Sequence, residues 1–360
     1  MPLKEKGKGK RLLVVCAVLA VLLAANLFLY GCSGGGKQVA PPAAEKPAEG
    51  EQTPPEKKQL QRISIATGGT GGTYYPYGGA VANIINNYIS WIEATVEVTG
   101  ASVENARLLD QKEAQLATMM NDVVYHALNA EGAFDSVIEL RTLFCMYPHF
   151  FHIVVLEDSP IKTIEDLKGK RVSVGAPGSG TETMSNQVLE ALGISFDDIN
   201  VFRLSFAENA EALKDRVIDA GIWSVGAPTS SVMDLATTHK IRILNFTPEQ
   251  LAVIQGKYPY YSAIKLPAGI YQGLTEEVNG PSVWNSVIVH KDMPEEMAYE
   301  IVKAVFENQE ELIAVYVGAK DTTPDNTVFH AVAPLHPGAV RYLREIGLRI
   351  DDSLIPPEMK

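Results

Sequence analysis

Residues 63–76 read ISIATGGTGGTYYP, and this stretch decides how the folded part of the chain is built. Ile63 to Ala66 alternates as a strand does, residues 67–73 form a glycine-rich polar loop, and Pro76 suits the first turn of a helix. Apolar residues at helical spacing extend that helix from Tyr77 to Tyr88. The stretch therefore predicts one strand–loop–helix unit.

Similar units follow along the chain. Two come directly afterwards, with strands expected at 94–98 and 115–120 and helices at 102–109 and 123–128. A second set begins after Leu156, and its strands are expected at 172–174 and 220–224. Strands that alternate with helices at this spacing predict an α/β fold, in which helices cover both faces of a mostly parallel sheet.

The order of the elements predicts two lobes joined by two extended crossings. Residues 61–150 are expected to form the first part of lobe 1, and residues 151–282 to form lobe 2. Residues 283–360 return to lobe 1 through extended structure, a long amphipathic helix that reaches about Tyr316, and C-terminal helices. This arrangement is a two-lobed, hinged clamshell.

The N-terminal segment has the composition of an export signal. Residues 1–31 are interpreted as a signal peptide of lipoprotein type, because basic residues precede the apolar stretch 12–30. The motif that ends at Cys32 resembles the lipoprotein box, in which this thiol is acylated; an uncleaved membrane anchor is the alternative. Residues 32–60 are rich in Gly, Pro, Ala, Glu and Lys and predict a disordered tether. The protein is therefore expected outside the cytoplasm, in the periplasm or on the outer cell surface, with a lipid anchor in the membrane.

Charge and cysteine content exclude two classes of protein. The formal net charge is −12, which argues against nucleic-acid binding because phosphate backbones require clustered Lys and Arg. Three cysteines in 360 residues exclude a disulfide-stapled scaffold. Cys145, the one thiol of the expected folded region, is interpreted as a buried structural residue.

The motifs of common enzymes are incomplete in this sequence. The glycine run lacks the third glycine of a dinucleotide fingerprint and the lysine of a P-loop. Pro177 occupies the position where a nucleophile elbow around Ser179 needs glycine. His149 and His152 are the one close histidine pair, and strand alternation places them on opposite faces. We therefore expect neither an enzyme nor a bound metal or cofactor.

The polar loops predict a ligand site instead. They follow strands, and in such sheets ligands lie outside the carboxyl ends of the strands, where helix N-termini favour negative charge. Two donor-rich loops, at 70–75 and 179–181, are expected to face each other and to hold a carboxylate without an arginine. Trp223 and Tyr271 could form an apolar wall or belong to the core, and Glu182 could accept an ammonium group or occupy a favourable first helical turn. The candidate ligand-binding residues are Thr70, Gly71, Gly72, Thr73, Tyr74, Asn105, Asn121, Ser179, Gly180, Thr181, Glu182, Trp223 and Tyr271.

Five stretches resemble the TAXI family of TRAP-transporter solute receptors. The glycine-rich opening and the Ser-Gly-Thr-Glu loop are specific in combination, whereas the Asp-Leu-Lys-Gly-Lys stretch occurs in many binding proteins. The stretches are ATGGTGGTYYP at 66–76, TGASVEN at 99–105, DLKGKRVSVG at 166–175, GSGTE at 178–182 and PLHPGA at 334–339.

The resemblance implies a type II periplasmic-binding-protein fold with a ligand between two lobes. It further implies that a small organic acid, of dicarboxylate or acidic amino acid type, is delivered to a TRAP permease driven by an ion gradient. Sister receptors clamp the carboxylate with an arginine, but Arg107 falls inside a predicted helix and Arg171 at a strand start. A receptor of the same fold that signals to a sensor kinase fits the same residues, and an extracellular lipoprotein enzyme is the weakest alternative.

Overall fold

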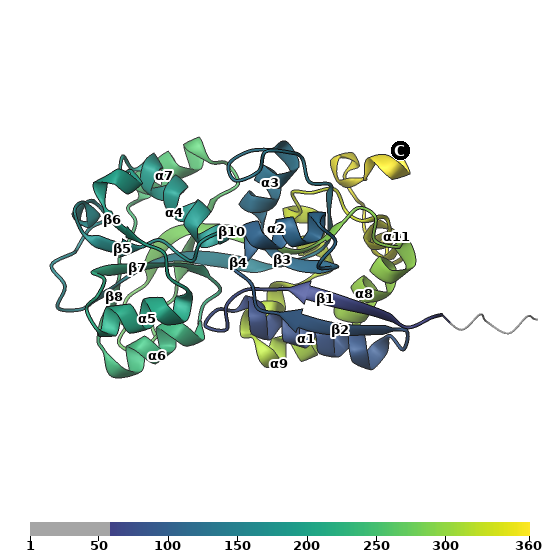
Figure 1. Cartoon of the computed structure of the whole chain (residues 1–360), viewed down its shortest axis with the longest axis horizontal. Coiled ribbons are helices and arrows are strands. Elements are labelled where there is room, and N and C mark those ends of the chain that lie inside the picture. Colours follow the sequence, from purple (N-terminus) through teal and green to yellow (C-terminus); the bar gives the residue numbers. More distant parts are fainter. Residues whose placement is uncertain (1–57) are drawn as a thin grey trace, which may run out of the picture. The chain divides into compact units, whose positions relative to one another are not determined.

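Two long strands run through the middle of the fold and connect its two lobes. The computed structural model describes residues 58–360, so the predictions of a signal peptide, of lipidation at Cys32 and of most of the tether lie outside the described residues (Figure 1). Strands β4 (Leu140–Leu156) and β10 (Val278–His290) pair antiparallel from Ser282–Phe150 to His290–Leu140. Each strand therefore has one end in each lobe.

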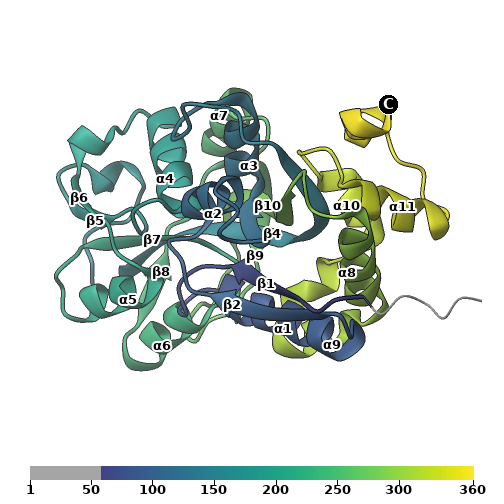
Figure 2. The ribbon, with the colours of Figure 1, turned by 45° about the vertical axis from the view of Figure 1, so that its right-hand side comes forward.

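Lobe 1 contains the parallel strands that precede β4. Strand β1 pairs with both β2 and β3, and β3 lies antiparallel to β10. Figure 2 shows the C-terminal helices gathered at the end of lobe 1 that lies away from lobe 2. The elements of lobe 1 are β1 (Gln61–Ala66), α1 (Tyr74–Tyr88), β2 (Ile92–Glu97), α2 (Ser102–Asp110), β3 (Leu116–Met120), α3 (Asn121–Asn129), α8 (Glu295–Glu307), α9 (Gln309–Val315), α10 (Pro324–His330) and α11 (Pro337–Glu345).

Lobe 2 repeats this plan on the other side of the long strands. Strand β5 pairs in parallel with β6 and β7, while β7 and β8 pair antiparallel with β4 and β9 with β10. Among the described residues, ten strands form one sheet, in the order β2-β1-β3-β10-β4-β7-β5-β6 apart from β8 and β9. The elements of lobe 2 are β5 (Arg171–Ser173), α4 (Gly180–Ala191), β6 (Asn200–Phe202), α5 (Phe206–Lys214), β7 (Ala220–Val225), α6 (Ser230–Thr238), β8 (Ile241–Ile243), α7 (Pro248–Lys257) and β9 (Ser262–Leu266).

The α/β fold with two lobes is confirmed, with two corrections to its details. The sheet is mixed and not mostly parallel, because the two crossing strands run antiparallel to their neighbours. The single helix expected to reach Tyr316 is broken at Asn308, whose backbone and side-chain N–H groups both donate to the Ala304 carbonyl. The predicted lobe limits at 150/151 and 282/283 fall inside β4 and β10, and we keep them as a proposal about where the chain bends.

Two apolar clusters form the core. The larger includes the inward faces of α1 and α8, and the smaller lies within lobe 2 and contains Trp223 and Tyr271. Each large apolar side chain buried in this way contributes roughly 1.5–3 kcal/mol. Cys145 is buried beside Ser286, with its Sγ 3.3 Å from the Ser286 Oγ, which confirms the interpretation of a structural cysteine. Among residues 58–360, no helix combines the length and apolarity that a bilayer crossing requires.

Candidate functional site

A cavity of about 70 Å³ lies where the carboxyl ends of the strands of both lobes meet. A single water needs about 10–15 Å³, so the cavity has room for a ligand larger than one water. Its walls are glycines, small hydroxyl side chains and a few larger residues. They are Gly68, Gly69, Gly72, Thr73, Tyr74, Thr99, Gly100, Ala101, Ser102, Met120, His149, Ala176, Ser179, Gly180, Thr181, Ser205, Phe206, Ser224 and Val225.

Four helices begin at the wall of this cavity. Helices α1 and α2 come from lobe 1, and α4 and α5 come from lobe 2. The first-turn N–H groups of a helix have no acceptor within it, and the positive end of the helix dipole favours an anion. The N-cap residues that line the cavity are Thr73, Ala101, Ser179 and Ser205.

Glycine at position 180 lets α4 approach lobe 1 closely. A Cβ atom there would lie 2.5 Å from the Met120 Sδ and 2.9 Å from the Ser102 Oγ. The preceding residue fixes the helix start, because the Ser179 Oγ accepts from the Glu182 N–H at 3.1 Å and donates to the Ala176 carbonyl at 2.7 Å. The Ser-Gly pair therefore positions a capped helix end against the opposite lobe.

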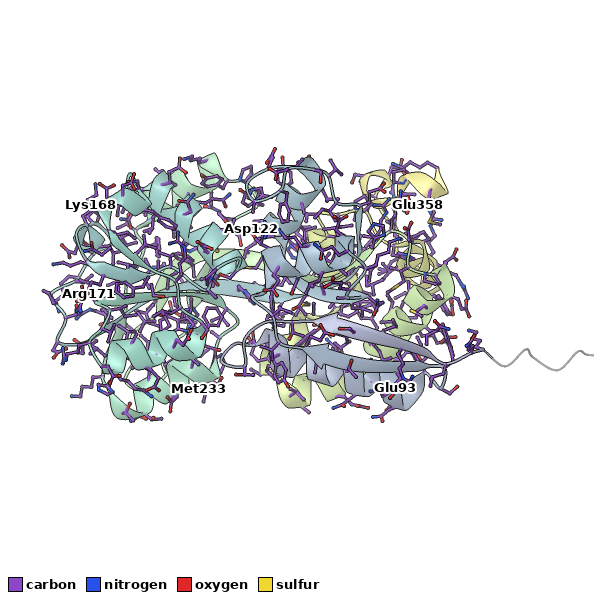
Figure 3. The ribbon with its side chains drawn as sticks, in the orientation of Figure 1. Glu93, Asp122, Lys168, Arg171, Met233 and Glu358 are labelled. Atoms are coloured by element: carbon purple, nitrogen blue, oxygen red, sulfur yellow. The ribbon has the colours of Figure 1, made fainter. Side chains whose placement is uncertain are left out.

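The cavity wall carries no Lys, Arg, Asp or Glu. Burial lowers the pKa of His149 to about 3, with a further lowering from His152, so the imidazole is neutral at physiological pH. Arg107 donates to the Ala133 carbonyl, and Arg171 pairs with Asp219 at 2.7 Å. Figure 3 places Arg171 at the outer end of lobe 2, so neither arginine clamps an anion in this cavity.

Six of the predicted ligand-binding residues line the cavity. Gly72, Thr73 and Tyr74 reach it from the glycine-rich loop of lobe 1. From lobe 2, the cavity is lined by the Ser179–Thr181 stretch at the start of α4. The structure thus brings the two donor-rich loops together, and their role in binding stays a prediction.

The glycine-rich loop also contains two residues that the structure places elsewhere. Thr70 is exposed and does not line the cavity. The carbonyl of Gly71 accepts hydrogen bonds from the N-terminal end of α6, including one of 3.1 Å from the Thr229 Oγ1. Neither residue lines this cavity, and their predicted contact with a ligand stays untested; the Gly71 carbonyl instead joins the two lobes directly.

The two asparagines are framework residues of lobe 1. The Asn105 amide donates to the carbonyls of Thr67 and Thr118, at 2.7 Å and 2.9 Å, and so links α2 to neighbouring strands. The Asn121 amide donates to the His330 carbonyl at 2.8 Å. Both side chains are buried and do not line the cavity, so their predicted contact with a ligand stays untested.

Three predicted residues of lobe 2 also lie away from the cavity. Glu182 accepts from Arg203 at 2.5 Å, outside the cavity wall. Trp223 donates to the Ser231 Oγ at 3.1 Å, and the Tyr271 hydroxyl lies 3.1 Å from the His152 Nε2. Both aromatic residues are buried in the lobe 2 core, which agrees with the alternative that they are core residues. Neither forms an apolar wall of this cavity.

Sequence reasoning overlooked His149 as a site residue. Its ring borders the cavity from β4 and lies 4.9 Å from the Tyr74 ring, between centroids. The side chain is 3% exposed, yet neither ring nitrogen forms a hydrogen bond; the nearby Ser224 backbone favours the charged form only weakly. The position of this residue where β4 passes from lobe 1 to lobe 2 is the signal that could have found it.

A second group of polar side chains also bridges the lobes, and we call it the interlobe cluster. It comprises Asp122 and His126 of α3, Gln187 of α4, and Tyr260 and Tyr261 before β9. The Tyr261 hydroxyl lies 2.8 Å from the Asp122 Oδ2 and also contacts the Gln187 Oε1. The His126 Nε2 lies 3.2 Å from the Gln187 Nε2 and 3.3 Å from the Tyr260 hydroxyl.

Burial controls the charge of this cluster. It raises the pKa of Asp122 to about 6, although the hydrogen bond from Tyr261 and backbone N–H groups oppose the rise. Figure 3 shows Asp122 at the junction of the two lobes. Within the described residues, no group of three or more His, Cys, Asp or Glu side chains is arranged to hold a metal ion.

Known proteins resemble this chain in fold and, over a shorter stretch, in sequence. A protein of Bordetella bronchiseptica RB50 has a TM-score of 0.50 at 17% identity, covering 84% of this chain and 95% of that one. The periplasmic aliphatic sulphonate binding protein SsuA from Escherichia coli has a TM-score of 0.41 at 16% identity, covering 79% and 78%. An Escherichia coli (strain K12) protein named for aliphatic sulfonate binding is 36% identical over 76 residues, which span 21% of this chain and only 23% of that protein.

The family assignment rests on a much longer sequence match than the 76 residues shared with the Escherichia coli protein. It begins within β1, includes every cavity-lining residue, and extends through the last α-helix of lobe 1. Because residues 65–347, well over half of the chain, match the NMT1-like family, the chain belongs to that family.

Proposed function

We propose that this protein is an extracytoplasmic solute-binding receptor that closes its two lobes around a small organic anion. The observation that carries the proposal is the convergence of four helix N-termini on one cavity whose wall has no charged side chain. Backbone N–H groups and hydroxyls can bind an anion there without an arginine. The Glu104 carboxylate already accepts from the Gly100 N–H at 2.6 Å and the Glu208 carboxylate from the Ser205 N–H at 2.8 Å, so the anion would bind the remaining donors.

The ligand is expected to carry an anionic head group. The resemblance to TAXI receptors suggests dicarboxylates and acidic amino acids, and the named relatives suggest aliphatic sulfonates. Carboxylates and sulfonates share the oxygen acceptors that helix N-termini recognise. A panel of ligands therefore has to include both head groups.

Delivery to a membrane permease is the second part of the proposal. Residues 178–182 and the glycine-rich opening favour a TRAP permease, and the export segment that ends at Cys32 favours a lipid-anchored receptor outside the cytoplasm. Uptake into vesicles that contain the permease separates the driving forces. Uptake that needs a sodium gradient supports a TRAP system, uptake that needs ATP contradicts it, and binding without uptake favours the sensory alternative.

The binding claim is tested by calorimetry on the full chain in detergent. Small carboxylates and sulfonates are titrated, and at least one is expected to bind with a dissociation constant of about 1 μM, equivalent to about 8 kcal/mol. The same ligand at 100 times that concentration should stabilise the fold by about 2.7 kcal/mol in thermal unfolding. If no anion binds or stabilises the chain, the proposed function is wrong.

A further inference from the structure

Two buried polar side chains at the cavity wall have no hydrogen-bond partner. The Thr73 Oγ1 is unpaired, and so are both ring nitrogens of His149. The two residues are 4% and 3% exposed. The Tyr147 hydroxyl next to Thr73 is also unpaired, and so are the hydroxyls of Ser64, Ser173 and Ser282, but these four residues do not line the cavity.

The donors and acceptors of these two side chains define which ligand group could form hydrogen bonds with them. A neutral imidazole offers one donor and one acceptor, and a threonine hydroxyl offers the same pair. Buried polar groups in folded proteins are nearly always paired. A carboxylate or carbonyl oxygen can accept from the two donors, whereas the acceptor nitrogen of His149 is satisfied only by a donor such as a ligand hydroxyl.

The position of Thr73 places that group close to the anionic head. Thr73 is the N-cap of α1, whose first N–H groups are among those proposed to bind the anion. A ligand atom that pairs with the Thr73 hydroxyl lies beside that helix end, and His149 packs against Tyr74 in the next position of the chain. The polar group and the head group are thus neighbours on the ligand.

The volume of the cavity and the charge of its wall restrict the class of ligand further. The cavity volume of about 70 Å³ favours a small acid. The cavity wall has no carboxylate that could pair with the ammonium group of an amino acid.

We propose, building on the proposed function, that Thr73 and His149 recognise a hydroxyl or carbonyl group next to the carboxylate. The ligand class is then small 2-hydroxy or 2-oxo monocarboxylic acids, and not dicarboxylates or amino acids. His149 acts as a neutral specificity residue at the point where β4 passes between the lobes.

The experiment compares six acids on the full chain by calorimetry: lactate, pyruvate, propionate, alanine, succinate and ethanesulfonate. Lactate or pyruvate is expected to bind at least tenfold more tightly than propionate, and alanine and succinate more weakly still. His149→Phe keeps a ring but removes the hydrogen bonds, and Thr73→Val keeps the shape without the hydroxyl. Both variants should lower the affinity for lactate or pyruvate more than that for propionate, so that the ratio of the two affinities falls from at least tenfold to near one.

A control variant tests whether a lost affinity is due to misfolding, and a second measurement tests the charge of His149. His239→Phe, at the end of α6 and outside the cavity, should bind all six acids as the natural chain does. Titration of the natural chain between pH 7.5 and 8.5, well above the pKa of about 6 of Asp122, in buffers of different ionisation enthalpy should show no proton uptake, because His149 stays neutral. Uptake of nearly one proton would mean that this imidazole pairs with an anion as a cation, and would overturn the inference.

The outcomes separate this inference from the proposed function. Equal binding of lactate, pyruvate and propionate, or tightest binding of succinate, alanine or ethanesulfonate, overturns the inference while the receptor proposal stands. Loss of all acids in His149→Phe with an intact fold also overturns it, because the residue would then only shape the cavity. If no anion binds the natural chain, both fail.

Discussion

The cavity wall and the interlobe cluster both lie where the two lobes meet. They differ in whether their buried polar side chains have hydrogen-bond partners. In the interlobe cluster, side chains of α3 and α4 pair with one another and with the tyrosines before β9. In the cavity, Thr73 and His149 are buried without partners. The polar side chains of the cluster are thus paired across the lobes, whereas those of the cavity would be paired only by a bound ligand, as proposed above.

The two regions also differ in how they carry charge. The Tyr261 hydroxyl has one proton but faces two acceptors, the Asp122 Oδ2 and the Gln187 Oε1. A protonated Asp122 can supply the second proton, which agrees with its raised pKa of about 6. The one histidine of the cavity stays neutral far below that pH. Lobe closure should therefore respond to pH through the cluster and ligand recognition should not.

The largest effect is expected from closing the cavity itself. Gly180→Leu would drive a side chain into Met120 and Ser102 of the opposite lobe, where even a Cβ lies within 3 Å of both. Calorimetry should show at least a thousandfold loss of anion affinity, about 4 kcal/mol. Gly256→Leu, on α7 where a Cβ meets nothing within 4 Å, is the matched control and should bind normally. Equal affinity in the two variants would remove the cavity from the binding site.

The second-largest effect is expected in the pH dependence of stability, which tests the interlobe cluster. The pKa of Asp122 is about 6 in the fold and about 4 when unfolded, so the fold holds the proton more tightly. Its contribution to stability is full below pH 4, falls as pH rises through 6, and spans about 3 kcal/mol. Asp122→Asn should lose this dependence.

Urea unfolding of the natural chain and of Asp122→Asn, from pH 4 to 7.5, measures this pH dependence of the unfolding free energy. The difference in unfolding free energy between the natural chain and Asp122→Asn cancels the opposite trend of surface carboxylates, many of which have lowered pKa values. A difference that stays constant across this range would show that Asp122 is ionised in the fold and that the proton count given above is wrong.

A smaller effect separates the two tyrosines of the cluster. Tyr261→Phe removes the hydroxyl that joins Asp122 to Gln187 and should cost about 2 kcal/mol of unfolding free energy. Tyr260→Phe removes one long contact to His126 and should cost less than about 1 kcal/mol. Chemical denaturation at pH 7 compares them, and equal losses would contradict the connected arrangement described for the cluster.

The smallest effect concerns the exposed end of the glycine-rich loop. Thr70→Ala should change anion affinity by less than twofold, because this side chain lies outside the cavity. Thr73→Val, three residues later, is expected to lower the affinity for a 2-hydroxy acid about tenfold. If calorimetry reverses this order, the loop meets the ligand in another way than the cavity geometry implies.

Much of the fold was accessible from the sequence because local patterns dominate it. The glycine-rich stretch at 67–73 and the serine cap at Ser179 have strong turn and helix-start preferences, and the structure brings both to one cavity. The length of β4 was not accessible, since a strand buried throughout gives a continuous apolar run without alternation.

The division between site and framework depends on contacts distant in sequence. Thr70 and Thr73 have the same side chain in the same loop, and only the approach of lobe 2 decides which one borders the cavity. Trp223 packs into the lobe 2 core because Ser231 and Phe206 surround it, and neither partner can be identified from spacing. His149 is a site candidate only because its long-range neighbours leave its nitrogens unpaired.

The central claim is that helix N-termini of both lobes hold an anion between them. A crystal structure of the chain grown with the tightest-binding acid tests it most directly. We expect one carboxylate in the cavity, within hydrogen-bond distance of N–H groups at the starts of both α1 and α4, with its neighbouring oxygen on Thr73 or His149. An anion bound to surface lysines or arginines, with this cavity empty between closed lobes, would contradict the account.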